Sequence, residues 1–105
     1  TPAHTYAFCT DTLYHESLID KIKGVDLLYH EATFMSDLQD RAFKTGHSTN
    51  LQAANIAKKA NVKNLLIGHY SQRYKDLSIL LEETVNVFSN SYLSYPGMVI
   101  DFKNI

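Results

Sequence analysis

The chain has 105 residues, of which 45% are hydrophobic and 20% charged, a composition typical of one small globular domain that excludes a disordered or collagen-like chain. Its formal net charge of −1 gives no overall positive potential that would attract nucleic acid, so the composition neither indicates nor excludes that kind of partner. No apolar run approaches the roughly 20 residues of a membrane-spanning helix and no secretion leader opens the chain, so we expect a soluble, cytoplasmic protein without a membrane partner.

Short apolar runs alternate with segments of helical spacing along the chain. Helices are expected over Glu16–Ile22, Ser36–Lys44, Asn50–Ala60 and Ser78–Phe88. Strands are expected over Tyr6–Thr10, Leu27–Tyr29, Leu65–Ile67 and Met98–Phe102. The only cysteine, Cys9, excludes an internal disulfide and is interpreted as a buried thiol. This alternation favours one α/β unit.

Local signals mark the ends of these helices. Gly24 and Gly46 are placed to stop the helices before them, and Ser36 is a candidate N-cap. Either Ser48 or Thr49 can cap the alanine-rich helix that follows. The spacing predicts an apolar face of Leu51, Ala54, Ile56, Ala57 and Ala60 on that helix, and of Leu81, Val85 and Phe88 on the last one. Ser89–Ser91 is predicted to be a turn.

Three of the predicted strands end on polar side chains. The first ends on Asp11, the second on His30 and Glu31, and the third, through Gly68, on His69. The carboxyl ends of strands in an open α/β sheet are where ligands usually bind. Because a divalent metal ion needs several converging donors, this rim is a candidate metal site.

Each candidate also has a plainer interpretation. Asp11 can be an N-cap, and a lone histidine such as His69 is more often structural than a ligand. His30 and Glu31 are adjacent in a strand and point to opposite faces, and we expect Glu31 to face the site. His47, in a glycine-preceded loop, is either a solvent-facing histidine or a general acid held protonated by a carboxylate such as Glu31. Arg73 can bind phosphate or pair with a surface carboxylate.

Four blocks in register carry a family resemblance. They are Phe8-Cys9-Thr10-Asp11-Thr12, then Leu27 to Phe34 with its His-Glu-Ala-Thr core, then Gly46-His47-Ser48-Thr49, and finally Gly68 to Tyr74. Together they resemble the carboxyl-terminal half of ribonuclease Z, a tRNA 3′-processing endonuclease of the metallo-β-lactamase superfamily. The resemblance runs from about Tyr6 to Phe102.

The resemblance implies a four-layer αββα sandwich, of which residues 1–105 form the carboxyl-terminal half, one sheet with its helices. It implies that Asp11 bridges two zinc ions and that His69 completes the shell of the second. It assigns His47 and Glu31 to proton donation or charge stabilisation at the scissile phosphate, and it places Ser48 and Thr49 near the RNA backbone. Arg73 remains a candidate for binding the substrate. The implied reaction is hydrolysis after the discriminator nucleotide, leaving a 3′-hydroxyl on the tRNA and a 5′-phosphate on the trailer.

The family's His-x-His-x-Asp-His motif does not occur in these residues, and the chain starts Thr1-Pro2 without an initiator methionine. We therefore expect a piece of a longer protein that cleaves nothing without its missing amino-terminal half, and whose parent is a homodimer by family likeness. Two other interpretations are a related metallo-hydrolase acting on small phosphodiesters or sulfate esters, and a non-catalytic α/β interaction module.

Overall fold

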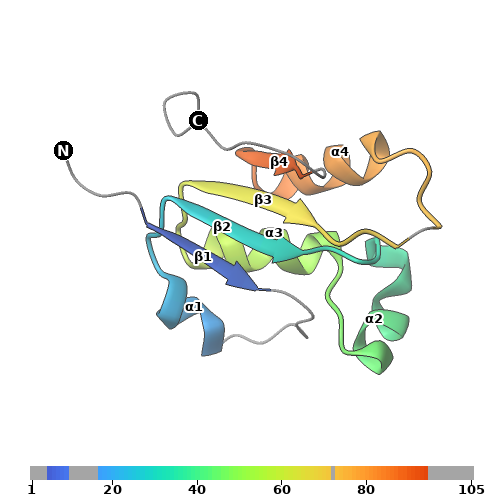
Figure 1. The fold of residues 1–105 in the computed structure, drawn as a ribbon, viewed down its shortest axis with the longest axis horizontal. Helices are drawn as coiled ribbons and strands as arrows, with labels where there is room; N and C mark the ends of the chain where they lie inside the picture. Colours follow the sequence, from blue (N-terminus) through green and yellow to red (C-terminus); the bar gives the residue numbers. More distant parts are fainter. Residues whose placement is uncertain (1–4, 10–16, 72, 95–105) are drawn as a thin grey trace.

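The computed structural model of the chain describes residues 5–9, 17–71 and 73–94. Four strands form one parallel sheet in sequence order: β1 (Tyr6–Cys9), β2 (Leu27–Glu31), β3 (Asn64–Gly68) and β4 (Ser91–Leu93). The connections contain α1 (Ser17–Ile22), the short 3₁₀ helix η1 (Ser36–Leu38), α2 (Gln39–Thr45), α3 (Asn50–Lys59) and α4 (Ser78–Val87). Figure 1 shows the strands running side by side with their carboxyl ends toward α2. Every strand therefore delivers its last residues to the same edge.

The helices α1, α3 and α4 form a layer on one face of the sheet. Helix α3 packs against β2 and β3, while α1 and α4 pack against α3 on its two sides. Strands that follow one another in order, joined by crossovers of one hand, require their helices to lie on one face. Alanines at the contact surface of α3, fully buried at positions 53, 54 and 57, allow the helix to approach the sheet closely around Leu28 and Leu65.

The opposite face of the sheet carries a row of large side chains. Phe8, Tyr29, Leu66 and Tyr92 are register partners across the four strands, so their side chains share this face. Phe8 is 65% exposed and Tyr92 39% exposed, and the Phe8 and Tyr29 rings pack with centroids 5.8 Å apart. This face is uncovered by any described helix, as expected for a single sheet of a two-sheet sandwich.

The loop between α2 and α3 is fixed at both ends by backbone signals in the sequence. Gly46 ends α2 in the left-handed conformation, with φ 76°, a region that glycine enters without steric cost. Thr49 begins α3 with a capping box: its side chain accepts from the Gln52 backbone N–H, and the Gln52 side chain accepts from the Thr49 backbone N–H. Both predicted signals are confirmed, and they hold His47 and Ser48 between two anchored helix ends.

The predicted helices and the first three strands are confirmed to within two residues at each end, but several details differ. Ser36 is the first residue of η1 and not its N-cap, which is Met35. Helix α4 buries Leu80 and Thr84, whereas Val85 is 36% exposed, so the predicted apolar face is wrong by about one residue. Strand β4 begins at Ser91, the last residue of the predicted turn Ser89–Ser91, and its pairing with β3 adds a strand that was not predicted there. The strand predicted at Met98–Phe102 lies outside the described residues.

Within the described part of the chain, no helix is long and apolar enough to cross a membrane.

Candidate active site at the carboxyl edge of the sheet

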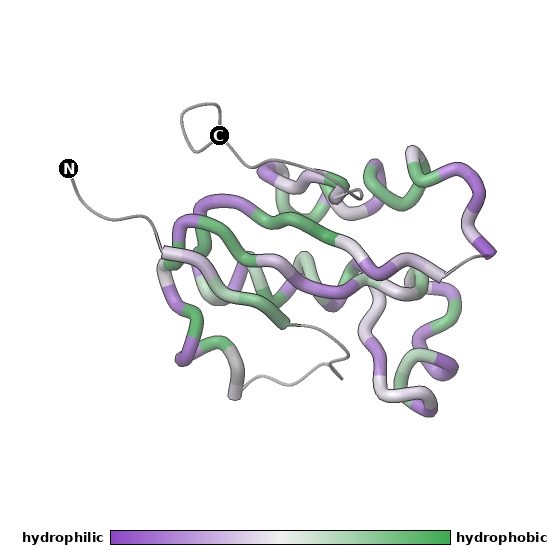
Figure 2. The backbone as a smooth tube through the Cα atoms, viewed as in Figure 1, coloured by the Kyte–Doolittle hydropathy of each residue, from purple (hydrophilic) through white to green (hydrophobic). Residues whose placement is uncertain are grey.

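The carboxyl ends of β2 and β3 change from apolar to polar within two residues. Figure 2 shows the hydrophobic interiors of both strands giving way to hydrophilic residues at this edge. Glu31, the last residue of β2, is the register partner of Gly68, the last residue of β3, so His69 lies one position beyond it. The Ala32 backbone N–H donates to the Gly68 carbonyl at 2.8 Å, which extends the pairing past the strand ends. Glu31 and His69 therefore lie on adjacent strands at a fixed offset.

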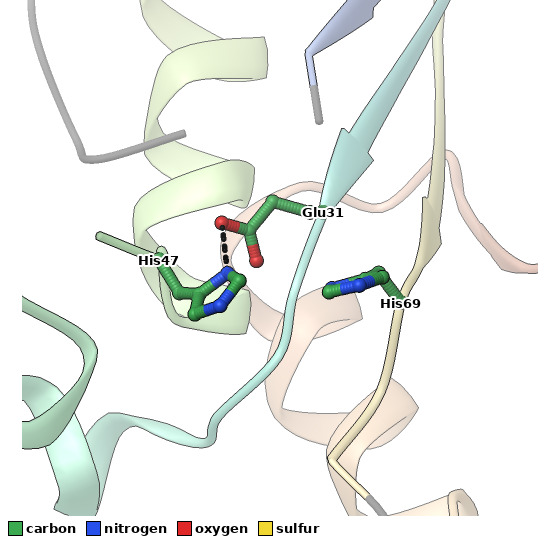
Figure 3. A group of neighbouring side chains, drawn as sticks. All are labelled: Glu31, His47 and His69. Carbon is green, nitrogen blue, oxygen red and sulfur yellow. Dashed lines mark hydrogen bonds and ion pairs between the residues drawn. The ribbon is translucent and has the colours of Figure 1, made fainter. Parts of the chain in front are cut away.

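Gly68 ends β3, and the backbone at Gly68 and His69 restricts which residues fit there. A Cβ at position 68 would overlap the hydroxyls of Tyr29 and Ser94, so a side chain there would require both of these side chains to move. His69 follows with φ 60°, a left-handed conformation uncommon for residues with a side chain. The His69 imidazole points toward Glu31 (Figure 3).

The buried Glu31 carboxylate accepts hydrogen bonds at both oxygens. Oε1 accepts from the Ser48 backbone N–H at 2.8 Å and lies 3.2 Å from His47 Nδ1. Oε2 accepts from the Thr33 backbone N–H at 3.2 Å and from the Thr33 hydroxyl at 2.5 Å. An ionised carboxylate has acceptor sites only, so the two Glu31 oxygens can pair with all of these donors although the side chain is fully buried.

The two imidazoles lie on either side of this carboxylate (Figure 3). Their ring centroids are 5.4 Å apart, with an angle of 32° between the planes. One donor atom from each of Glu31, His47 and His69 lies within 4.8 Å of the others, a spacing that could hold a metal ion. The donors fit that role unequally, since the Glu31 oxygens are already engaged by four hydrogen-bond donors. His69 is the most exposed of the three side chains.

Two aromatic contacts continue from His47 toward the surface. The Phe34 ring meets the His47 ring edge-on at 6.3 Å between centroids, and the exposed Arg73 guanidinium lies 5.6 Å from the Phe34 centroid. The Tyr74 hydroxyl accepts from the Met35 backbone N–H at 2.8 Å, which ties the segment after His69 to the one after Glu31. Arg73 is thus held near the site by a cation–π contact and is not paired with a carboxylate by any described contact.

The structure brings some of the predicted residues together and separates others. Glu31, His47 and His69 converge, and Arg73 lies within one aromatic ring of them. Ser48 and Thr49 are fully buried, and the Thr49 hydroxyl is used in the cap of α3. Asp11 lies outside the described residues.

Thr33 belongs to this site although its sequence position gave it no separate role. Its hydroxyl lies 2.5 Å from Glu31 Oε2, 3.0 Å from His69 Nδ1 and 3.4 Å from His47 Nδ1. The available signal was its position two residues after Glu31, which in extended backbone places both side chains on one face.

His30, next to Glu31, faces the helix layer. Its Nδ1 lies 2.7 Å from the Glu31 carbonyl, and its Nε2 is buried without a hydrogen bond from any described residue. Burial lowers the pKa of His30, an effect only partly offset by the Glu31 carbonyl and charge. His30 is therefore a neutral core histidine.

Comparison with known proteins shows which proteins the chain is similar to. The chain is 48% identical over 103 residues to ribonuclease Z of Bacteroides thetaiotaomicron, covering 98% of this chain and 33% of that protein. It is 52% identical over 101 residues to ribonuclease Z of Porphyromonas gingivalis strain W83, covering 96% of this chain and 33% of that protein. The resemblance to ribonuclease Z is confirmed. No family model matches the chain.

Solved structures agree with this ribonuclease Z likeness and confirm the fold. The metallo-β-lactamase fold protein YhfI from Bacillus subtilis superposes with a TM-score of 0.86 at 30% identity, covering 94% of this chain and 40% of that one. Human tRNase Z, short form, superposes with a TM-score of 0.66 at 31% identity, covering 90% of this chain and 30% of that one. The chain thus has a metallo-β-lactamase-like fold and spans about a third of the length of its ribonuclease Z relatives.

Proposed function

We propose that the protein containing this chain is a metal-dependent endoribonuclease that removes the 3′ trailer from precursor tRNA in the cytoplasm. Relatives named ribonuclease Z, at about half identity over nearly the whole chain, support this substrate. The chain contributes the carboxyl-terminal half of the domain, and its uncovered sheet face is suited to the missing amino-terminal half.

The observation that carries the proposal is the bond between His47 and the saturated Glu31 carboxylate. Glu31 can only accept, so His47 Nδ1 must be the protonated nitrogen of that pair. When the imidazole is charged, Nε2 bears a proton as well. His47 is therefore equipped to donate that proton to a leaving oxygen, or to stabilise charge on the phosphate, while Glu31 fixes its orientation.

Metal use follows from the family and is compatible with the donors present. In this proposal Asp11 and His69 bind two zinc ions together with residues of the missing half. Such a pair supplies a nucleophile near neutral pH and stabilises charge on the phosphate. Since each ion needs about three protein donors, the isolated chain is expected to be inactive.

The substrate would approach over the exposed side of this edge. Arg73, held over Phe34, is the cation best placed to meet a phosphate. Ser48 and Thr49 act from inside the fold in this scheme: the Ser48 backbone N–H holds Glu31, and Thr49 holds the helix that follows. A homodimeric parent, as the family likeness suggests, is part of the proposal.

One observation favours a second candidate, a metallo-hydrolase of small phosphodiesters. The chain superposes more closely on YhfI, whose name gives only the metallo-β-lactamase fold, than on human tRNase Z, at similar identity, so the fold is matched better than the tRNA-processing structure is. Comparing cleavage of a precursor tRNA with that of a chromogenic phosphodiester by the full-length protein separates the two candidates, and preference for the small ester would replace the first proposal.

The test of site roles uses the full-length protein with three variants. Asp11→Ala and His69→Ala should lose zinc, measured by elemental analysis, together with tRNA cleavage. His47→Ala should keep zinc and lose about 10²- to 10⁴-fold in turnover, the usual contribution of a general acid. Loss of zinc from His47→Ala would make His47 a ligand instead. Unchanged zinc in both other variants would favour the non-catalytic interpretation.

A further inference from the structure

Thr33 lies where one hydroxyl must satisfy several partners. It is buried, and its Oγ1 lies within hydrogen-bonding distance of the Glu31 carboxylate and of the Nδ1 atoms of both His47 and His69. A hydroxyl has a single proton to donate. Deciding where that proton goes fixes the protonation of its neighbours.

The distances decide in favour of Glu31. The separation of 2.5 Å to Oε2 is that of a charge-assisted O–H···O⁻ bond. The contact to His69 Nδ1 is 3.0 Å and that to His47 Nδ1 is 3.4 Å, and His47 already donates to the other carboxylate oxygen. Thr33 therefore donates to Glu31, and its oxygen is left to accept from His69.

We propose that Thr33 is a positioning residue that holds His69 in the tautomer protonated at Nδ1, with the lone pair on Nε2 directed to a metal ion. The inference rests on the proposed metal site and assigns a residue outside the ligand set. Glu31 takes part in both halves of the arrangement: it orients His47 directly and His69 through the Thr33 hydroxyl. One buried carboxylate thus sets the nitrogen that each imidazole presents to the reaction.

The first test needs no substitution. In metal-free full-length protein labelled with ¹⁵N-histidine, long-range ¹H–¹⁵N correlation distinguishes the two neutral tautomers, and His69→Ala assigns the signal. We expect Nδ1 protonated and Nε2 unprotonated at a pH where the ring is neutral. A His69 ring protonated at Nε2 overturns the proposal.

The second test measures zinc affinity with a chelator competition. Thr33→Val keeps the shape of the side chain without the hydroxyl and should weaken Zn²⁺ binding about 10- to 100-fold, the range found for partners of metal ligands. Thr33→Ser restores the hydroxyl and should restore affinity. Equal affinity of wild type and Thr33→Val overturns the proposal when His69→Ala still loses zinc. If His69→Ala also retains zinc, the proposed metal site itself fails.

Discussion

The two ends of strands β2 and β3 are stabilised by different interactions. Around Leu28 and Leu65 the strands are packed against alanines of α3, and stability there comes from removing apolar surface from water. Two or three residues further along the same strands, a buried carboxylate is held by four donors from two segments of the chain. The first region tolerates any well-packed apolar set, whereas the second depends on the identity of every donor.

This difference separates stability from activity. Loss of volume in the helix-facing core should unfold the domain without altering the chemistry of the molecules that remain folded. Loss of a hydrogen-bond donor or acceptor at the carboxyl edge should alter both stability and activity, because the hydrogen bonds that stabilise the buried Glu31 carboxylate also orient the histidines. Three measurements probe this separation.

The largest effect on stability is expected from the core. Ile56→Ala removes a fully buried side chain of α3 and should lower the free energy of unfolding by about 2–5 kcal/mol, measured by urea denaturation. The matched variant Ile79→Ala truncates an isoleucine on α4 that is 61% exposed and should cost less than about 0.5 kcal/mol. A changed zinc affinity in folded Ile56→Ala protein would show that core and edge are coupled.

A smaller loss of stability, with loss of activity, is expected from Glu31→Gln. The amide has the shape of the carboxylate but places an N–H₂ group against donors, so at least one buried donor is left unpaired, at a cost of about 1–3 kcal/mol. Glu82→Gln, the same change at an exposed position of α4, is the control. Equal unfolding midpoints for the two variants would contradict the four-donor description of Glu31.

The smallest effect is a pH dependence from His30. Burial lowers the pKa of this ring below the ordinary value of 6.5, so the unfolded chain binds the proton more readily. Stability is unaffected by His30 above pH 6.5 and falls as the pH drops from 6.5 through the folded-state pKa, by at most about 1.4 kcal/mol per pH unit.

His30→Asn should make this fall shallower, as measured by urea midpoints at intervals from pH 8 to pH 5. An identical slope in wild type and variant would show that another group is responsible. The midpoints at pH 8 serve as the reference, since His30 is neutral there in both the folded and the unfolded chain.

The sequence predicted the parts of the fold that depend on local signals. Gly46 and Thr49 fix helix ends through backbone conformation and one side-chain bond, so their roles could be recognised from residue type. The face of α4 could not, because Leu80 and Leu81 are equally apolar and only the position of α3 decides which is buried. Strand β4 was missed because its three residues are too few to show a strand pattern and are placed by contacts with β3 and α4.

The position of the site at the strand ends could be predicted from the sequence, but the hydrogen bonds among its side chains could not. Polar residues after apolar runs indicated that Glu31 and His69 would share an edge. Thr33 was not singled out, since a threonine after a strand has no chemistry of its own until its neighbours are placed. The donors to the buried Glu31 carboxylate come in part from the loop that contains His47. The position of that loop is set by tertiary packing, so these donors could not be predicted from the sequence.

Among the described residues, Asn61 with φ 55° and His69 with φ 60° adopt left-handed backbone conformations although they carry side chains. Asparagine and histidine both enter this region more often than most residues with a side chain, but the conformation still costs a non-glycine residue of order 1–3 kcal/mol. Glycine at position 69 would relieve that cost and delete the imidazole. A selection for thermostability alone would therefore favour glycine at position 69 and remove a side chain of the proposed site, so directed evolution at this position must screen for stability and activity together.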